Sequence, residues 1–219
     1  MPLSELSSTV QDYLKVIWSA TEWSPTPVTV TQLAERMGVR KATVSLGLRR
    51  LTDAGLVRHE PYGGIELTDE GRRHAVGMVR RHRILETFLV ESLGYAWDEV
   101  HDEAENLEHA VSDTLIDRID ALLGHPSRDP HGDPIPSREG EPHLPEAMRL
   151  TDAPPGAPLT VERISDADPD VLRELARRGI RPGVALAPPP DLPPAVAAAI
   201  WVSASPRTPT PPAAPRSTR

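Results

Sequence analysis

Residues 28–67 of the chain read VTVTQLAERMGVRKATVSLGLRRLTDAGLVRHEPYGGIEL. Leucine and valine recur in this stretch at helical spacing, and glycines stand where the chain has to turn. The expected elements are a helix over 32–37 capped by Thr31, a turn at Gly38-Val39, a helix over 41–54 ended by Gly55, and strands over 56–60 and 65–67 around Tyr62-Gly63-Gly64. A helix, a turn, a helix and a hairpin in this order predict a winged helix-turn-helix.

The second of these helices carries the side chains expected of a helix that reads DNA. They are Arg40, Lys41, Thr43, Ser45, Arg49 and Arg50. A recognition helix meets base edges with its N-terminal residues, where Arg and Lys suit phosphates and guanine and hydroxyl groups suit several bases. We therefore interpret the module as a reader of double-stranded DNA. Winged helices that bind proteins are the alternative that these residues leave open.

On the N-terminal side, residues 7–23 have the pattern of an amphipathic helix. Ser7 or Ser8 is a suitable N-cap, and apolar residues follow at helical spacing. Asp12 lies off the apolar stripe, which by itself indicates only a solvated carboxylate near a helix start.

On the C-terminal side, residues 101–109 read HDEAENLEH and lie early in a helix predicted over roughly 98–123. Glu105, Glu108 and His109 are three and four positions apart, so they share one face, and His101 stands one turn before Glu105. Carboxylates and an imidazole on one stripe form half of a site for a divalent cation. Ordinary solvated helix residues are the alternative reading of this stretch alone.

The preceding helix, which ends at the connection Gly94-Tyr95, offers a second half-site. His82 and Glu86 are four positions apart on it and share a face. An antiparallel hairpin of the two helices would bring His82, Glu86 and His101 together. This constellation is more specific than either half, and it predicts metal binding.

Composition restricts the remaining function classes. The chain has no cysteine, which excludes disulfides, thiolate zinc sites and cysteine nucleophiles, and which fits a cytoplasmic protein. We expect neither a signal peptide nor a membrane span, because no long apolar run is present. The net charge of −8 does not exclude nucleic acid as a partner, since the basic residues can cluster on one module.

The C-terminal third is rich in proline and weaker in pattern. Residues 124–145 are predicted to be a linker, with His125, His131 and His143 as solvated loop residues. A strand over 159–164, a short helix over 169–178 and an apolar run over 195–202 follow. The tail over 205–219 contains almost nothing apolar, so we expect it to be disordered.

Motifs spread along most of the chain resemble one family. They are Gln11-Asp12-Tyr13-Leu14, Ala42-Thr43-Val44-Ser45, Leu67-Thr68 with Gly71, Arg81-His82-Arg83, the whole run 101–109, and Pro130-His131-Gly132-Asp133-Pro134-Ile135-Pro136. Over roughly residues 7–136 the chain is similar to the diphtheria toxin repressor family of iron- and manganese-dependent transcriptional regulators. The resemblance implies a mainly α (α+β) fold, in which a winged helix-turn-helix precedes an all-helical dimerisation domain.

Carried over position by position, the resemblance implies two metal sites per subunit. The primary site would be Asp12, Glu105, Glu108 and His109, and the neighbouring site would be His82, Glu86 and His101. Iron-type members carry Met at the Asp12 position and Cys at the Glu105 position, whereas manganese-type members carry carboxylates. Mn²⁺ is therefore the implied cofactor, with Fe²⁺ as the alternative. Shorter manganese regulators have a further Glu where this chain has Lys15, and iron-type members have Gln where it has Leu46, so the operator sequence cannot be carried over.

Long-chain members of the family end in a small SH3-like β domain. Residues 159–183 resemble its first half and 197–202 its ending, but the proline-rich run 185–194 replaces a hairpin, so we expect a partial domain. The resemblance suggests Asp168 or Asp170 as an additional metal ligand. The expected domains are the winged helix over 1–73, a helical dimerisation and metal-binding domain over 74–145, a partial SH3-like (FeoA-like) domain over 146–204 and the disordered tail over 205–219.

These expectations combine into a metal-dependent repressor that is not an enzyme. It would bind palindromic operator DNA as a homodimer in the cytoplasm and control genes of metal uptake and homeostasis. One rival is a winged-helix regulator of an organic ligand, which would need an apolar pocket. The other is a carboxylate-bridged metal enzyme of a helical bundle, which would use Glu-x-x-His pairs on two helices, whereas Glu108 and His109 are adjacent.

Overall fold

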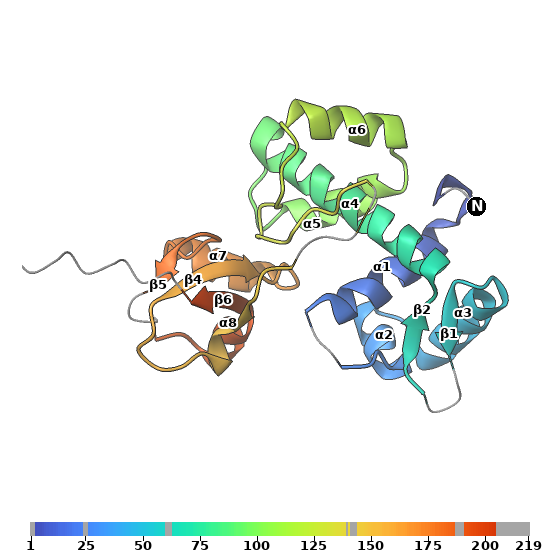
Figure 1. Cartoon of the computed structure of the whole chain (residues 1–219), viewed down its shortest axis with the longest axis horizontal. Coiled ribbons are helices and arrows are strands. Elements are labelled where there is room, and N and C mark those ends of the chain that lie inside the picture. Colours follow the sequence, from blue (N-terminus) through green and yellow to red (C-terminus); the bar gives the residue numbers. More distant parts are fainter. Residues whose placement is uncertain are drawn as a thin grey trace, which may run out of the picture. The chain divides into compact units, whose positions relative to one another are not determined.

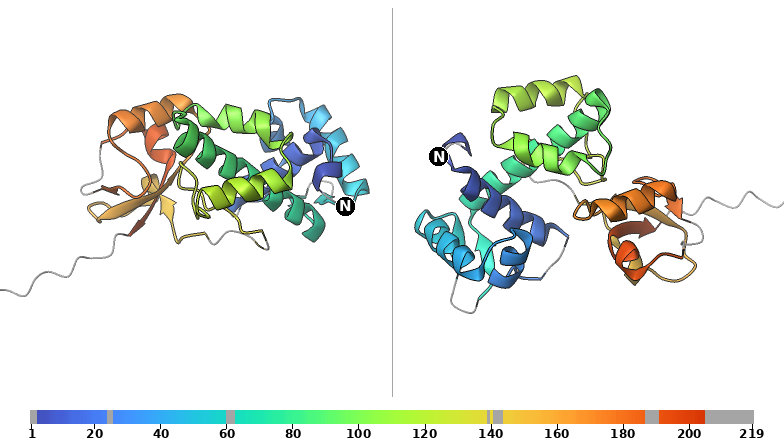
Figure 2. Two further views of the ribbon diagram at one scale, coloured as in Figure 1. Left: turned by 90° about the horizontal axis from the view of Figure 1, so that it is seen from above. Right: turned by 180° about the vertical axis from the view of Figure 1, so that it is seen from behind.

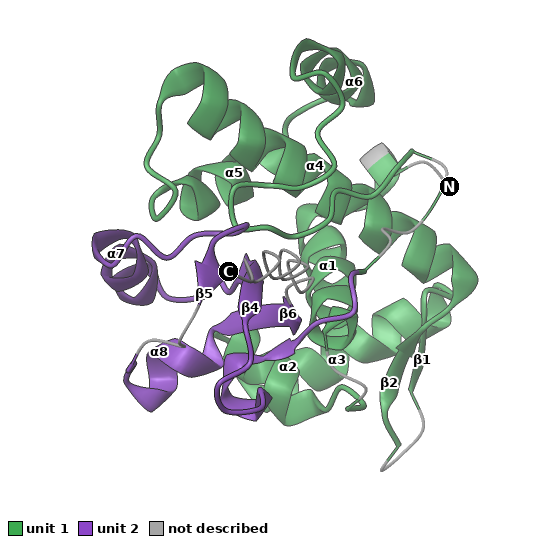
Figure 3. Cartoon of the chain, turned by 60° about the vertical axis from the view of Figure 1, so that its left-hand side comes forward, with its two compact units in different colours: residues 1–144 green, residues 145–219 purple. Residues whose placement is uncertain are grey.

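A computed structural model of the 219-residue chain describes residues 3–23, 26–59, 63–138, 140, 144–186 and 191–204. The chain divides into two compact units, Met1–Leu144 and Pro145–Arg219, coloured separately in Figure 3. The further division of the first unit at residue 73 stays a prediction. None of the described helices is long and apolar enough to cross a membrane.

The first unit is mainly helical (Figure 1). After a short 3-10 helix, Leu3–Glu5, it contains the helices α1 (Ser8–Glu22), α2 (Val30–Arg36), α3 (Lys41–Asp53), α4 (Asp69–Leu93), α5 (Val100–Glu108) and α6 (Asp113–Leu122), and the strands β1 (Val57–His59) and β2 (Ile65–Leu67). The views in Figure 2 show α4 extending from the winged helix into the group formed with α5 and α6.

The winged helix-turn-helix is confirmed, with one change at its start. β1 and β2 pair antiparallel, with Val57 opposite Leu67. The cap of α2 is Thr29, not the predicted Thr31: its side chain accepts a hydrogen bond from the Gln32 amide, and Gln32 returns one to the Thr29 backbone. This reciprocal capping box satisfies two otherwise unpaired donors, so the helix begins two residues earlier. The predicted hairpin turn at Tyr62 lies partly outside the described residues.

Two glycines allow close approach within this unit. A Cβ atom on Gly47 of α3 would lie 2.6 Å from the Tyr13 ring of α1, and one on Gly71 of α4 would lie 2.0 Å from the Leu56 carbonyl oxygen. Tyr13 also donates a hydrogen bond to the Thr43 carbonyl at 3.4 Å. These contacts pack α1 against α3, and the start of α4 against the residue that precedes β1.

The predicted helix over 98–123 is in fact two helices. α5 ends at Glu108, and Ser112 begins α6 by accepting a hydrogen bond from the Leu115 amide. A serine in this position competes with continuation of a helix and favours a new start. α4 ends at Gly94 in the left-handed region at φ 75°, as the predicted hairpin requires. Ile84 and Leu85 of α4 then pack with Val100 and Ala104 of α5 in a buried apolar cluster.

The segment 126–136 is not the solvated linker that we predicted. Asp129, His131 and Asp133 are 8%, 0% and 4% exposed, and His131 Nε2 donates a hydrogen bond to the Trp97 carbonyl oxygen at 2.7 Å. Their burial follows from packing against α4, which sequence patterns do not reveal. His125 is exposed, as predicted, and His143 lies outside the described residues.

The second unit is a small antiparallel sheet with two helices. Its elements are β3 (Met148–Arg149), a 3-10 helix (Leu150–Asp152), β4 (Leu159–Ile164), α7 (Pro169–Arg177), β5 (Ala185–Leu186), α8 (Pro194–Ala198) and β6 (Ile200–Ala204), with strand order β3-β6-β4-β5. Trp201 packs between the guanidinium groups of Arg149 and Arg163, 5.1 and 4.4 Å from its ring. The predicted strand and short helix are present. The tail over 205–219 lies outside the described residues.

Candidate metal centre and nucleic-acid interface

Three helices bring the acidic and imidazole side chains of the first unit to one place. Tyr13, Leu14, Ile17 and Trp18 bury the apolar face of α1, and α1 packs along α4. The polar residues of α1 near its N-terminus then face α5. This packing is what brings Asp12 close to Glu108 and His109, a proximity that the resemblance implied and that spacing could not supply.

Asp12, Glu108 and His109 form the first group. His109 Nε2 lies 2.9 Å from an Asp12 carboxylate oxygen, while its Nδ1 lies 2.7 Å from the amide oxygen of Gln11. One ligand atom from each of the three residues falls within 4.8 Å of the others, so the group could hold a metal ion. Gln11 was not among the predicted site residues; it fixes the His109 ring through the nitrogen opposite Asp12, a common way to orient a metal-binding imidazole.

Glu105 and Glu108 also meet a lysine. Lys15 Nζ donates a hydrogen bond to Glu105 Oε1 and another to Glu108 Oε1 at 2.6 Å. The second oxygen of Glu108, Oε2, lies 2.6 Å from His82 Nδ1. Glu108 is fully buried. Burial raises the pKa of this carboxyl, but the contacts with His82 and Lys15 outweigh burial and lower it. The carboxylate is therefore held in its charged form.

His82, Glu86 and His101 lie together, as the hairpin of α4 and α5 predicts. His82 Nε2 is 3.0 Å from Glu86 Oε1 and 3.2 Å from His101 Nδ1. Burial lowers the pKa of His82, but the Glu86 carboxylate raises it, and the net pKa is about 9. Glu86 is thus paired with an imidazolium. This pairing holds the pKa of Glu86 well below its usual range, against the effect of burial.

A further group was missed by sequence reasoning. Glu86, Asp129 and His131 are all buried and place ligand atoms within 4.8 Å of one another. His131 Nδ1 lies 3.8 Å from Glu86 Oε1. The signal available in the sequence was the run Pro130-His131-Gly132-Asp133-Pro134, in which proline and glycine fix a loop around two polar side chains.

Beside this group, a buried arginine joins α1 to α4 and the loop after α6. Arg83 donates to both carboxylate oxygens of Glu22, at 2.9 and 2.6 Å, and to the Pro134 carbonyl at 2.7 Å. Asp129 and Asp133 lie 3.6 and 3.7 Å from the same guanidinium. A bidentate contact of this kind fixes orientation as well as charge.

The donor atoms of all three groups are carboxylate oxygens and imidazole nitrogens. This set suits Mn²⁺ and Fe²⁺ better than ions that prefer thiolates. The predicted ligands lie close together in the first unit, and their chemistry fits a divalent cation: Asp12, Glu105, Glu108, His109, His82, Glu86 and His101. The predicted primary set is not gathered as one group, because Glu105 lies with His82 and Glu108 while Asp12 lies with Glu108 and His109.

Asp168 and Asp170 have local partners in the second unit. An Asp168 carboxylate oxygen caps α7 by accepting hydrogen bonds from the amides of Asp170 and Val171. Asp170 is exposed and pairs with Arg173 at 2.5 Å. Both carboxylates are thus engaged within α7, and their role as extra ligands stays a prediction.

The DNA-binding candidates all lie on the exposed side of α3. Arg40, Lys41, Thr43, Ser45, Arg49 and Arg50 are exposed, whereas Val44, Leu48 and Leu51 face the core. Leu46 is 51% exposed on the same side, beside Ser45. Ser45 Oγ donates to the Lys41 carbonyl at 3.0 Å. The helix thus presents four cations and two hydroxyls to solvent.

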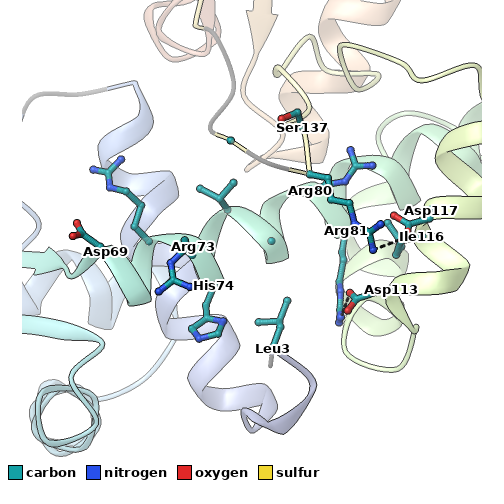
Figure 4. Close-up of a pocket in the computed structure, with 15 residues that line it drawn as sticks. Leu3, Asp69, Arg73, His74, Arg80, Arg81, Asp113, Ile116, Asp117 and Ser137 are labelled. Atoms are coloured by element: carbon teal, nitrogen blue, oxygen red, sulfur yellow. Dashed lines mark hydrogen bonds and ion pairs between the residues drawn. The ribbon is translucent and has the colours of Figure 1, made fainter. Parts of the chain in front are cut away.

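A cleft of about 560 Å³ opens elsewhere in the first unit, along α4 (Figure 4). Its lining includes Arg80 and Arg81, which are paired with Asp120 at 2.9 Å and Asp113 at 2.6 Å. Leu3, Val76 and Ile116 supply the apolar part. The lining of the cleft thus combines ion-paired side chains with apolar ones.

Comparison with known proteins decides the family. Two models of the iron-dependent repressors match the chain: the N-terminal DNA-binding domain over residues 5–65, and the metal-binding and dimerisation domain over 68–137. The iron-dependent repressor IdeR of Mycobacterium tuberculosis is 34% identical over 193 residues, which cover 82% of this chain and 83% of IdeR. The chain belongs to the diphtheria toxin repressor family. It is therefore a metal-dependent transcriptional repressor.

Other relatives of this repressor agree. The diphtheria toxin repressor of Corynebacterium efficiens is 32% identical over 193 residues, covering 83% of each chain. A solved manganese-dependent transcriptional repressor in complex with manganese is 50% identical, with a TM-score of 0.83 over 90% of this chain and all of that one. ScaR with bound Zn²⁺ is 29% identical, with a TM-score of 0.77 over 90% and 99%. A FeoA domain model matches residues 148–187, which accounts for the small β unit.

Proposed function

We propose that this repressor is activated by Mn²⁺, binds palindromic operator DNA as a homodimer in the cytoplasm, and controls genes of metal-ion uptake and homeostasis. The observation that carries the proposal is the cluster of carboxylates and imidazoles at the junction of α1, α4 and α5. Asp12 and Glu105 are both hard oxygen donors, which favour Mn²⁺. The 50% identical structure contains manganese.

Fe²⁺ is the second candidate, because the curated relatives at 32–34% identity include iron-dependent repressors. Oxygen and nitrogen ligands accept both ions, and affinity alone follows the general order in which Mn²⁺ binds most weakly. Manganese is favoured here because positions 12 and 105 carry carboxylates and no sulfur ligand.

In the proposed mechanism, Asp12, Glu105, Glu108 and His109 would hold one ion, and His82, Glu86 and His101 would hold a second. A bound ion supplies positive charge that offsets the repulsion among the carboxylates. Asp12 lies on α1 and the other primary ligands lie on α5 or directly after it, so shared ligation would tie α1 to the dimerisation helices. Because α1 also packs on α3 through Tyr13, this tie would favour one placement of the recognition helix.

A homodimer is supported by apolar side chains that the first unit leaves exposed. Leu115 and Leu122 of α6 are 44% and 70% exposed and stand seven positions apart, which places them on one helical face. Leu93 at the end of α4 is 58% exposed. Two subunits would present two copies of α3 about one DNA turn apart, roughly 34–36 Å, as a palindromic operator requires.

Calorimetric titration of the full chain with MnCl₂ tests the metal site. Glu108→Gln keeps the shape of the buried side chain and removes its charge, so we expect Mn²⁺ affinity to fall by roughly tenfold to a hundredfold. Asp102→Asn, an exposed change on the same helix, is the matched control and should leave the affinity within about twofold. Equal affinities for the two variants would contradict the assignment of Glu108 as a ligand.

A further inference from the structure

Lys15 of α1 lies among the candidate metal ligands, where its positive charge acts on the same carboxylates as a bound metal ion would. It follows Asp12 by three positions on α1, and its side chain is only 9% exposed. Its ammonium group is bonded to Glu105 Oε1, lies 2.6 Å from Glu108 Oε1, and lies 3.5 Å from His82 Nδ1. A lysine is seldom buried without such partners. The ammonium group is therefore inside the region that the candidate ligands surround.

The contacts of Glu108 show what this position implies. Oε1 faces Lys15 and Oε2 faces His82 Nδ1 at 2.6 Å, so each oxygen of this fully buried carboxylate already has a cationic or hydrogen-bonding partner. The Glu105 oxygen that faces the pocket is bonded to the same ammonium group. Glu105 and Glu108 thus have their inward oxygens occupied by a side chain of α1.

We propose that Lys15 is the resident cation of this carboxylate pocket, and that its ammonium group must withdraw from Glu105 and Glu108 before a divalent ion can bind the same oxygens. The inference rests on the proposed metal site and adds to it a competitor encoded in the chain. It makes Lys15 the residue that sets the metal concentration at which the repressor responds.

Removing the ammonium group should have two opposite effects. Without it, Glu105 and Glu108 lose the ammonium group that they share, while His82 remains the partner of Glu108 Oε2, and this loss destabilises the metal-free protein. The same change frees their oxygens and strengthens the attraction for a divalent cation. A lysine that only supports the fold would give the first effect without the second, so the pair of signs identifies competition.

The test uses the full chain as wild type and as Lys15→Met, which keeps a long apolar stem and removes the charge. For metal-free Lys15→Met we expect a melting temperature lower by about 5 °C. In calorimetric titration with MnCl₂ we expect a dissociation constant lower by about tenfold, which one lost competing charge can supply. Lys15→Arg keeps the charge and should stay near the wild type in both measurements.

Arg36→Met is the matched control, because it removes an exposed positive charge outside the pocket. It should change neither quantity, whereas an equal gain in Mn²⁺ affinity would assign the effect to net charge and overturn the proposal. The double variant Lys15→Met/Glu105→Gln removes one carboxylate as well and should recover the metal-free melting temperature. If Lys15→Met alone does not fold, the melting temperature of the double variant still tests the proposal. A double variant that does not recover the metal-free melting temperature would contradict the proposal.

The outcomes separate the two proposals. If the wild type binds Mn²⁺ but Lys15→Met binds it equally or more weakly, Lys15 supports the fold or the bound state, and competition is wrong while the metal site stands. If the wild type binds no Mn²⁺ at all, the proposed function fails, and the competition fails with it.

Discussion

Gly71 and Gly77 of α4 differ in what surrounds their missing side chains. At Gly71 an added Cβ would lie 2.0 Å from the Leu56 backbone oxygen, whereas at Gly77 the nearest atom is the Leu3 Cδ2 methyl at 3.3 Å. Backbone cannot yield as a side-chain methyl can. The first glycine is therefore needed to pack α4 on the winged helix, and the second is not.

This contrast predicts opposite effects of one substitution. Gly71→Ala should lower the free energy of unfolding by about 2 kcal/mol or more, because overpacking forces backbone shifts. Gly77→Ala should be neutral or raise it by up to about 1 kcal/mol through helix propensity. Urea unfolding of the two variants measures both values, and equal effects would contradict the packing that we describe.

At this scale the sequence predicted ligand types better than ligand surroundings. His82, Glu86 and His101 could be grouped from helical spacing and one hairpin, because both are local rules. Lys15, Gln11, Asp129 and His131 could not be placed, since their positions follow from the packing of α1 and of a loop on α4. Asp12 joined the site only through the resemblance to known repressors.

Among the elements, α1, α4 and the segment after α6 are joined by the buried guanidinium of Arg83. Its partner Glu22 ends α1, and Asp129 and Asp133 belong to the segment 126–136. Trp23 Nε1 donates to Asp133 at 3.0 Å and extends the same network. The connection keeps the end of α1 on α4 independently of the carboxylate pocket at its other end.

Arg83→Met should therefore destabilise the protein strongly. The variant leaves the buried carboxylates of Glu22 and Asp133 without their shared cation, and breaking a buried ion pair in this way costs about 3–5 kcal/mol. Arg73→Met removes an exposed pair with Glu70 on the same helix and should cost less than about 1 kcal/mol. Thermal unfolding compares them, and a mild effect of Arg83→Met would show that the network contributes little.

Element types were predicted more successfully than element limits. The winged helix followed from periodicity and glycine positions, but α2 starts at a capping box with Thr29, and α6 starts at Ser112 inside what looked like one helix. Caps depend on side-chain hydrogen bonds that several Ser and Thr residues of the sequence could supply. The burial of segment 126–136 depends on tertiary contacts and was not predictable from its proline and glycine content.

The whole molecule carries a net charge of −8, whereas its recognition helix is cationic. We therefore expect DNA to be attracted to α3 and not to the rest of the surface. Lys41 and Arg50 are exposed on α3, and each lost phosphate contact reduces the slope of log K against log salt by about one unit. Lys41→Ala/Arg50→Ala should therefore reduce the slope by about two units. Arg173→Ala/Arg177→Ala in the second unit should leave it unchanged; an unchanged slope in the first variant would place the DNA surface elsewhere.

Metal binding and operator binding are expected to be linked in this repressor. Fluorescence anisotropy of a labelled duplex, selected from random sequences in the presence of Mn²⁺, measures that linkage most directly. We predict a two-fold symmetric duplex that the chelator-treated protein binds roughly tenfold to a hundredfold more weakly than the Mn²⁺-loaded protein. Equal affinity of the chelator-treated and the Mn²⁺-loaded protein for that duplex would contradict the account.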